Sequence, residues 1–242
     1  MKFFGRKLMK KSKIIIFILS AVFFCAGVGG AAASESGGPA AEDSKSVLYI
    51  FAHQDDEALI IAKMASDTHF GADVHAVWIT DGSGTAPPHV RERESRNVMD
   101  LIGVPQENLY FLGYRDRDSW KSLDEVLSDV MEIARRVEPS EIVTNAYEGG
   151  NIDHDVANLT GAVVSSRVGD AVHYEFPLYN TYKGAYRVGK FLPFEGAETE
   201  YTRLNRHLLI LKDKVLEYYK SQAAVIGMLK SVIDQRALKK YG

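Results

Sequence analysis

The chain has 242 residues, of which 46% are hydrophobic and 25% are charged, with 29 basic and 32 acidic side chains. This is an ordinary globular composition, long enough for one sizeable hydrophobic core rather than two. The single cysteine, Cys25, excludes a disulfide framework within the chain.

The first 33 residues have the features of a secretory signal peptide. Six basic residues precede the apolar run Ile14–Val28, and three alanines offer a cleavage site before Ser34. The alternative is an uncleaved membrane anchor, for which this run is short because a span needs about 20 residues. We therefore expect an exported protein (periplasmic, cell-surface or secreted) that contacts a membrane only through this leader, if the leader stays uncleaved.

Removal of the leader changes the charge and the available ligands. Residues 34–242 keep 23 of the basic side chains and all 32 acidic ones, a net charge of −9. An acidic body argues against a nucleic-acid partner, because phosphate neutralisation needs Lys and Arg. Since Cys25 also leaves, any metal must be held by His, Asp or Glu.

After a flexible linker at 34–45, apolar β-rich runs alternate with amphipathic segments. We expect strands at 46–51, 74–80, 109–112, 141–144 and 172–176, and helices at 56–70, 89–102, 123–137 and 155–166. This alternation predicts a single α/β domain over 46–242, with a mostly parallel sheet and helices on both faces. Residues 178–202 predict irregular structure or a small β extension, and residues 212–240 predict a closing helix.

The stretch Val47–Glu57, VLYIFAHQDDE, carries the strongest chemical signal. An apolar strand stops abruptly and is followed by His53, Asp55 and Asp56, at the sheet edge where open α/β folds place ligands. One imidazole and two carboxylates at this spacing suit a metal ion such as Zn²⁺. The alternative is helix capping by Asp56 and Glu57, which leaves His53 unexplained.

The later predicted strands end in polar residues that meet at the same edge. These are Asp81, Arg115, Asp116, Asn151, Asp153, His154 and Asp155. A set of His53, Asp56 and His154 leaves a metal position open for water, as catalytic zinc sites do. Asp55 lies beside a ligand but is itself free, so it could take a proton from that water.

Two motifs carry a resemblance to a known family. Residues 52–57, Ala-His-Gln-Asp-Asp-Glu, resemble the AHPDDE motif of the PIG-L/LmbE-like family of zinc-dependent deacetylases, which act on N-acetylglucosamine-containing and related substrates. Residues 149–154, Gly-Gly-Asn-Ile-Asp-His, resemble its second motif, which usually ends in His-Pro-Asp-His. Two motifs in the right order, about 100 residues apart, are a fairly specific signal.

The resemblance implies a Rossmann-like fold and attack on an acetamide carbonyl. It implies that His53, Asp56 and His154 are the Zn²⁺ ligands and that Asp55 is the general base that activates the zinc-bound water. It further implies that Asp153 orients neighbouring groups. By the same resemblance, Arg91 and Asp116 are expected to contact the substrate or the groups around the metal.

Two positions depart from the family pattern. Gln54 replaces the proline of the first motif, which should affect only the stiffness of the turn. Asn151 replaces the first histidine of the second motif, which in the family helps to stabilise the oxyanion. Asn can donate a neutral hydrogen bond but cannot act as an imidazolium acid, and loss of one such contact typically costs about 2.7–4 kcal/mol in the barrier.

Three consequences of Asn151 stay open at this stage. Asn151 acts as a neutral donor, another group such as His89, His173 or Tyr147 takes the role, or activity is low or lost while the metal site survives. The sequence thus predicts an exported zinc-dependent deacetylase of an N-acetylated sugar or glycoconjugate. The alternatives are a catalytically weakened zinc- and glycan-binding protein of the same fold, and an amidase for another N-acyl substrate.

Overall fold

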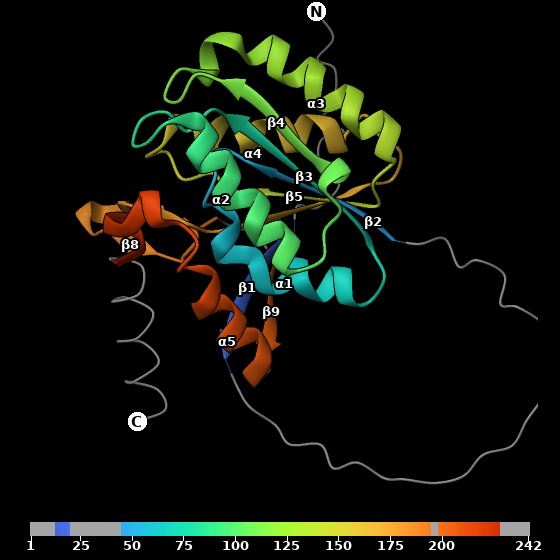
Figure 1. The fold of residues 1–242 in the computed structure, drawn as a ribbon. Helices are drawn as coiled ribbons and strands as arrows, with labels where there is room; N and C mark the ends of the chain where they lie inside the picture. Colours follow the sequence, from blue (N-terminus) through green and yellow to red (C-terminus); the bar gives the residue numbers. More distant parts are fainter. Residues whose placement is uncertain (1–12, 20–44, 195–197, 228–242) are drawn as a thin grey trace, which may run out of the picture.

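The computed structural model describes residues 13–19, 45–194 and 198–227 (Figure 1). Its strands are β1 (Lys13–Leu19), β2 (Ser46–Phe51), β3 (Asp73–Thr80), β4 (Leu109–Tyr114), β5 (Glu141–Asn145), β6 (Val172–Phe176), β7 (Tyr179–Asn180), β8 (Arg187–Val188) and β9 (Glu198–Leu204). Its α-helices are α1 (Glu57–His69), α2 (Pro88–Leu101), α3 (Leu123–Val137), α4 (Ile152–Ser165) and α5 (Arg206–Val215).

Seven of these strands form one parallel sheet, in the order β4-β3-β2-β5-β6-β1-β9. Helices α1, α2 and α5 cover one face, and α3 and α4 cover the other (Figure 1). The predicted α/β architecture is therefore confirmed. Strands β7 and β8 form a separate antiparallel pair, which matches the small β extension expected within 178–202.

Strand β2 runs through the middle of the sheet and is buried on both faces. Val47, Tyr49 and Phe51 pack into the core beneath α1 and α2, whereas Leu48 and Ile50 pack beneath α3 and α4. Successive side chains of a strand point to opposite faces, so one continuous apolar run supplies both cores.

Two predicted helices differ from the observed ones. Helix α4 begins at Ile152, three residues earlier than expected, because the side chain of Asn151 accepts a hydrogen bond from the backbone N–H of Asp153 and caps the helix. The continuous helix expected over 212–240 is wrong within the described residues. Helix α5 ends at Val215, and a 3-10 turn at Lys220–Gln222 follows. Residues 228–240 lie outside the described part.

Strand β1 lies inside the predicted leader, where no strand was expected. It pairs in parallel with β6 through Lys13 and Ile14, and along its whole length with β9. Residues 1–12 and 20–44, the remainder of the leader and nearly all of the linker, lie outside the described residues, so cleavage and export stay predictions. None of the described helices combines the length and apolar character needed to cross a bilayer.

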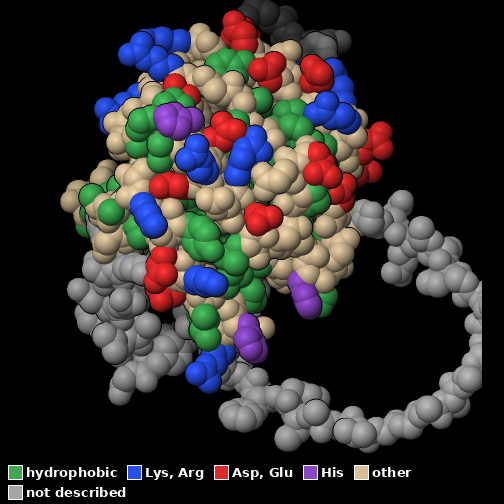
Figure 2. Space-filling view, in the orientation of Figure 1, with side chains coloured by type: hydrophobic (Ala, Val, Ile, Leu, Met, Phe, Trp, Pro, Cys, Tyr) green, Lys and Arg blue, Asp and Glu red, His purple; other side chains and the backbone are tan. Residues whose placement is uncertain are grey.

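The parallel arrangement gathers functional side chains at one edge. The carboxyl ends of β2, β3, β4 and β5 all lie on the side of the sheet where the β7–β8 hairpin packs (Figure 1). On the face shown in Figure 2, acidic and basic side chains are interspersed and neither sign forms a continuous patch. This face therefore offers no basic surface of the kind that binds a nucleic-acid backbone.

Gly161 marks a close approach of α4 to the sheet. A Cβ at this position would lie 2.2 Å from Thr144 Cγ2 and 2.9 Å from His173 Nε2. We expect Gly161→Ala to lower the free energy of unfolding by about 1–3 kcal/mol, the usual cost of an overpacked core. Thermal denaturation measures it. Gly227→Ala is the matched control, since a Cβ there meets no atom within 4 Å. An unchanged Tm for Gly161→Ala would contradict this packing.

The position of β1 generates a second prediction. Strand β9 pairs within the sheet with β1 alone, whereas β2 to β5 pair with one another. We expect residues 34–242, which lack β1, to fold. Amide hydrogens of β9 should exchange faster in this shortened chain than in the full chain, whereas those of β2 to β5 should exchange at the same rate in both. Exchange measured by mass spectrometry on both chains checks this. Equally slow exchange of β9 in both chains would show that β1 does not hold it.

Candidate active site

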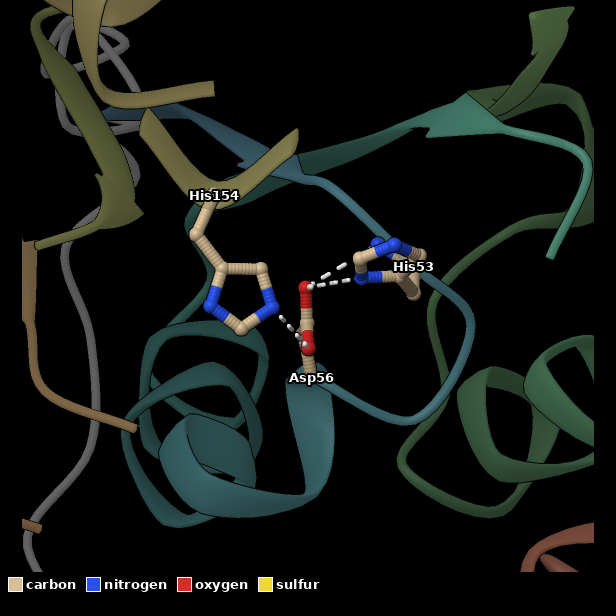
Figure 3. Close-up of side chains that lie close together, drawn as sticks. All are labelled: His53, Asp56 and His154. Carbon is tan, nitrogen blue, oxygen red and sulfur yellow. Dashed lines mark hydrogen bonds and ion pairs between the residues drawn. The ribbon is translucent and has the colours of Figure 1, made fainter. Parts of the chain in front are cut away.

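Three buried side chains meet at the carboxyl end of β2 (Figure 3). His53 follows this strand, Asp56 precedes α1, and His154 lies in the first turn of α4. One ligand atom of each lies within 4.8 Å of those of the others. His154 Nε2 is 3.6 Å from Asp56 Oδ1, and His53 Nδ1 is 3.8 Å from Asp56 Oδ2. The structure thus brings together the three residues predicted as metal ligands.

The carboxylate of Asp56 is held through one of its oxygens. Oδ2 accepts hydrogen bonds from the backbone N–H groups of Ala52 (3.1 Å) and His53 (3.0 Å) and from Asn145 Nδ2 (3.0 Å). Oδ1 is left facing His154. Asp56 occupies the N-cap position of α1, but its side chain makes no capping hydrogen bond to the helix, so capping does not account for how this carboxylate is held.

Each imidazole is oriented by carboxylates on its far side. His154 Nδ1 lies 2.9 Å from Glu148 Oε2, and His53 Nε2 lies 3.3 Å from Asp153 Oδ2 and 3.5 Å from Asp116 Oδ1. The remaining nitrogens, His154 Nε2 and His53 Nδ1, therefore face Asp56. Carboxylate–imidazole pairs of this kind fix the tautomer of metal-binding histidines, so the donor set fits zinc.

The electrostatics of this cluster favour a cation. Burial alone would lower the pKa of His53, but hydrogen bonds to Asp116 and Asp153 and the charge of Asp56 raise it to about 10. The hydrogen bond with His53 in turn lowers the pKa of Asp116 to about 2. The same negative charge that holds a proton on His53 would attract a divalent cation, which binds in competition with that proton.

Asp55 is placed beside these ligands by a strained backbone. Its φ is 129°, in the region that L-residues rarely adopt. Its backbone N–H donates to Glu57 Oε2 at 2.9 Å, and its Oδ1 lies 3.2 Å from Arg91 Nη2. Burial raises the pKa of Asp55 to about 7, with the Arg91 charge opposing the rise. A carboxylate with such a pKa suits a general base at neutral pH.

Glu57 holds Asp55 in place, a role not anticipated from the sequence. Its fully buried carboxylate accepts hydrogen bonds from Trp78 Nε1 (3.0 Å), Ser95 Oγ (2.5 Å) and Tyr219 OH (2.8 Å), besides the Asp55 amide. Glu57 lies in the first turn of α1, as the capping alternative expected, but its side chain turns into the core. It ties the loop of the first motif to β3, to α2 and to the segment after α5.

Arg91, expected to contact the substrate or groups around the metal, is enclosed by protein groups. It is 3% exposed, and its guanidinium donates to the backbone oxygens of Gln54 and Gly82 (3.2 Å for Gly82) as well as pairing with Asp55. Gln54, the residue in place of the motif proline, donates from Nε2 to the backbone oxygen of Thr80 at 2.8 Å. These contacts tie the β2–α1 loop to β3 and α2. A direct substrate contact by Arg91 stays a prediction.

Asp116 and Asp153 both lie on the far side of His53. Asp116 Oδ2 also accepts from the Gly84 N–H at 3.0 Å. Asp153, fully buried, accepts from the Arg117 N–H at 2.6 Å and from Ser119 Oγ at 2.5 Å. This placement suits the orienting role expected for Asp153. Catalytic participation of Asp153 and substrate contact by Asp116 stay predictions.

The side chain of Asn151 forms hydrogen bonds with two neighbouring groups. Its Oδ1 caps α4, and its Nδ2 donates to the hydroxyl of Tyr179 at 3.1 Å. Of the suggested replacements for the missing histidine, His173 is wrong, because it lies in the core 2.8 Å from Thr144 Oγ1. Burial there lowers the pKa of His173 to about 4. The other two suggested replacements are His89, which lies exposed on α2, and Tyr147, which is half-exposed. A role for either of them stays a prediction.

Three further residues of the site were missed by sequence reasoning. Asn145 binds Asp56, Glu148 binds His154, and Tyr179 packs edge-to-face on His154 with ring centroids 5.4 Å apart. Glu148 had a visible signal, since it is an acidic residue in the loop of the second motif. Asn145 and Tyr179 had none, because only the pairing of β5 with β2 and the path of the chain after β6 bring them to the site.

The family described as GlcNAc-PI de-N-acetylase, PIG-L, matches residues 48–164. This segment contains both motifs and all three candidate ligands. The chain carries a domain of the PIG-L family. The resemblance inferred from the two motifs is thereby confirmed. A search of curated proteins finds none that matches the chain.

Solved structures share the fold of this PIG-L domain. A deacetylase from the biosynthesis pathway of teicoplanin superposes with a TM-score of 0.64 at 18% identity, over 81% of this chain and 93% of that one. The N,N'-diacetylchitobiose deacetylase of Pyrococcus horikoshii superposes with a TM-score of 0.55 at 21% identity, over 74% of this chain and 71% of that one. The 4-carboxy-2-hydroxymuconate hydratase of Pseudomonas putida superposes with a TM-score of 0.56 at 16% identity, over 81% of this chain and 87% of that one. One fold therefore carries different chemistries, and the activity must be argued from the site.

Metal binding tests the assignment of the ligands. We expect about one zinc per chain after reconstitution, loss of zinc in Asp56→Ala and His154→Ala, and about 10- to 100-fold weaker zinc binding in Glu148→Gln, which loses the orienting carboxylate. Elemental analysis and competition with a chelator measure this. His69→Ala, at the exposed end of α1, is the control. Full zinc binding by Asp56→Ala would refute the site.

Proposed function

We propose that this protein is a zinc-dependent hydrolase that removes the acetyl group from an N-acetylated amino sugar or glycoconjugate. The observation that carries the proposal is the buried cluster of His53, Asp56 and His154 with the Asp55 carboxylate beside it, within a PIG-L domain. Catalytic zinc sites use three protein ligands and keep one position open, and hydrolysis needs a base next to that position.

The donor set favours zinc over harder cations. Two imidazoles and one carboxylate are typical zinc ligands, whereas Mg²⁺ and Ca²⁺ prefer oxygen alone. When bound, zinc supplies a Lewis acid that polarises the substrate carbonyl and lowers the pKa of a water molecule to about 7.

The protein side chains handle the proton. Asp55 takes a proton from the attacking water, because its pKa of about 7 lets it both accept and return a proton at neutral pH. The water oxygen forms the new bond to the acetyl carbon. The proton on Asp55 passes to the amide nitrogen, the carbon–nitrogen bond breaks, and the amine leaves as a neutral group. Arg91 and Glu57 hold the carboxylate and the backbone of Asp55 during these transfers.

Exposed aromatic side chains near the candidate ligands support a sugar substrate. Tyr186 is 51% exposed and stacks on Tyr179 with ring centroids 5.5 Å apart, and Tyr147 in the loop of the second motif is 54% exposed. Exposed rings next to a metal centre offer apolar faces with polar edges, which suits sugar rings. The predicted leader adds to the proposal that the substrate lies in the cell envelope or outside the cell.

The activity test pairs turnover with metal content. On residues 34–242, we expect amine release from N-acetylglucosamine or short chito-oligosaccharides, and a fall in kcat of about 10²–10⁴-fold in Asp55→Asn, the contribution of a positioned general base. Zinc content should not change, because Asp55 is not a ligand. Glu92→Gln, at a half-exposed carboxylate of α2 that pairs with Arg96, is the control.

The other outcomes identify the alternatives. Zinc without turnover of any N-acetylated sugar, followed by a large gain of activity in Asn151→His, would favour a catalytically weakened glycan-binding protein. Turnover confined to acylated peptides or other amides would favour an amidase with a different substrate. Full activity in Asp55→Asn would refute the proposed base.

A further inference from the structure

We propose that the Tyr179 hydroxyl is the hydrogen-bond donor to the substrate carbonyl oxygen, and that Asn151 acts through Tyr179 as a positioning residue. This inference rests on the proposed function. It assigns a role to Tyr179 of β7, which lies outside the two motifs and outside the segment matched by the family.

The hydrogen bonds of Asn151 leave it poorly placed to donate directly. Its Oδ1 accepts from the Asp153 N–H at 3.0 Å, and its Nδ2 donates to the Tyr179 hydroxyl at 3.1 Å. A hydroxyl that accepts one hydrogen bond keeps its own hydrogen to donate. Within the described part of the chain, no second hydrogen bond uses the hydrogen of Tyr179. The amide therefore fixes the hydroxyl and leaves its donor available.

Tyr179 and the candidate metal ligand His154 are held by the same carboxylate, that of Glu148. Its backbone N–H donates to Glu148 Oε1 at 2.6 Å, while Glu148 Oε2 lies 2.9 Å from His154 Nδ1. Its ring packs edge-to-face on the His154 ring. One carboxylate thus sets the position of His154 and of the strand that carries Tyr179. Such a shared support gives a catalytic donor the fixed geometry that it needs.

The hydroxyl of a tyrosine carries its proton at neutral pH, so it is available as a neutral donor. A neutral donor held next to the metal ligands stabilises the negative charge that develops on the carbonyl oxygen more than it stabilises the uncharged substrate. It supplies the stabilisation that the family's histidine would give at position 151.

The test compares Tyr179→Phe, Asn151→Ser and the double variant in residues 34–242. Serine keeps the helix cap but removes the amide donor. We expect kcat to fall about 100-fold in Tyr179→Phe, with little change in KM and full zinc content, because the donor acts mainly in the transition state. In Asn151→Ser, kcat should fall about tenfold. The double variant should have the same kcat as Tyr179→Phe alone, because the two residues act in series. Tyr182→Phe, in the exposed turn of the same hairpin, is the control.

A binding measurement adds a readout independent of turnover. The zinc-loaded Tyr179→Phe variant should bind the product acetate about tenfold more weakly than the wild type by calorimetry, because one hydrogen bond to a charged oxygen is lost. Wild-type kcat and unchanged acetate affinity in Tyr179→Phe would overturn this inference alone. Effects that multiply in the double variant would overturn the serial role of Asn151. A wild type that turns over no N-acetylated substrate would overturn the proposed function and this inference together.

Discussion

The anchoring of one buried carboxylate, that of Asp56, is the interaction on which the site depends. A buried anion is tolerated only when hydrogen bonds or opposite charges replace its water. Two backbone amides at the end of β2 and the amide of Asn145 on β5 hold one oxygen, which also lies 3.8 Å from His53 Nδ1. The other oxygen faces His154, 3.6 Å from its Nε2. Because these donors belong to neighbouring strands, the parallel pairing of β2 with β5 sets the geometry of the candidate metal centre.

Three further carboxylates hold the candidate ligands and the candidate base in position. Asp153 supports His53, Glu148 supports His154, and Glu57 supports the backbone of Asp55. Each of them also accepts hydrogen bonds from a different part of the chain, so each joins one functional side chain to the scaffold. This arrangement concentrates negative charge in a small buried volume. A divalent cation would relieve that charge, which gives the metal assignment an electrostatic basis besides the identity of the ligands.

The two departures from the family motifs are absorbed by local contacts. Gln54 ties the first-motif loop to the end of β3 through its side-chain amide, where a proline would restrain the backbone alone. Asn151 caps α4 and reaches Tyr179, so its amide remains connected to the site although it differs from histidine. The fold by itself does not distinguish these chemistries, since a hydratase of similar fold exists. The placement of Asp55 beside His53, Asp56 and His154 is what favours hydrolysis.

The sequence by itself determined the alternation of strands and helices and the meeting of His53, Asp56 and His154. Hydrophobic periodicity marks each element, and parallel strands must place their carboxyl ends at one edge. Only the tertiary structure decided which way Glu57 points, since its partners Ser95 and Tyr219 lie 38 and 162 residues away. It alone decided that Tyr179 meets His154 and that the last predicted helix breaks after Val215. Contacts between distant segments leave no periodic pattern in the sequence, because they depend on how finished elements pack against one another.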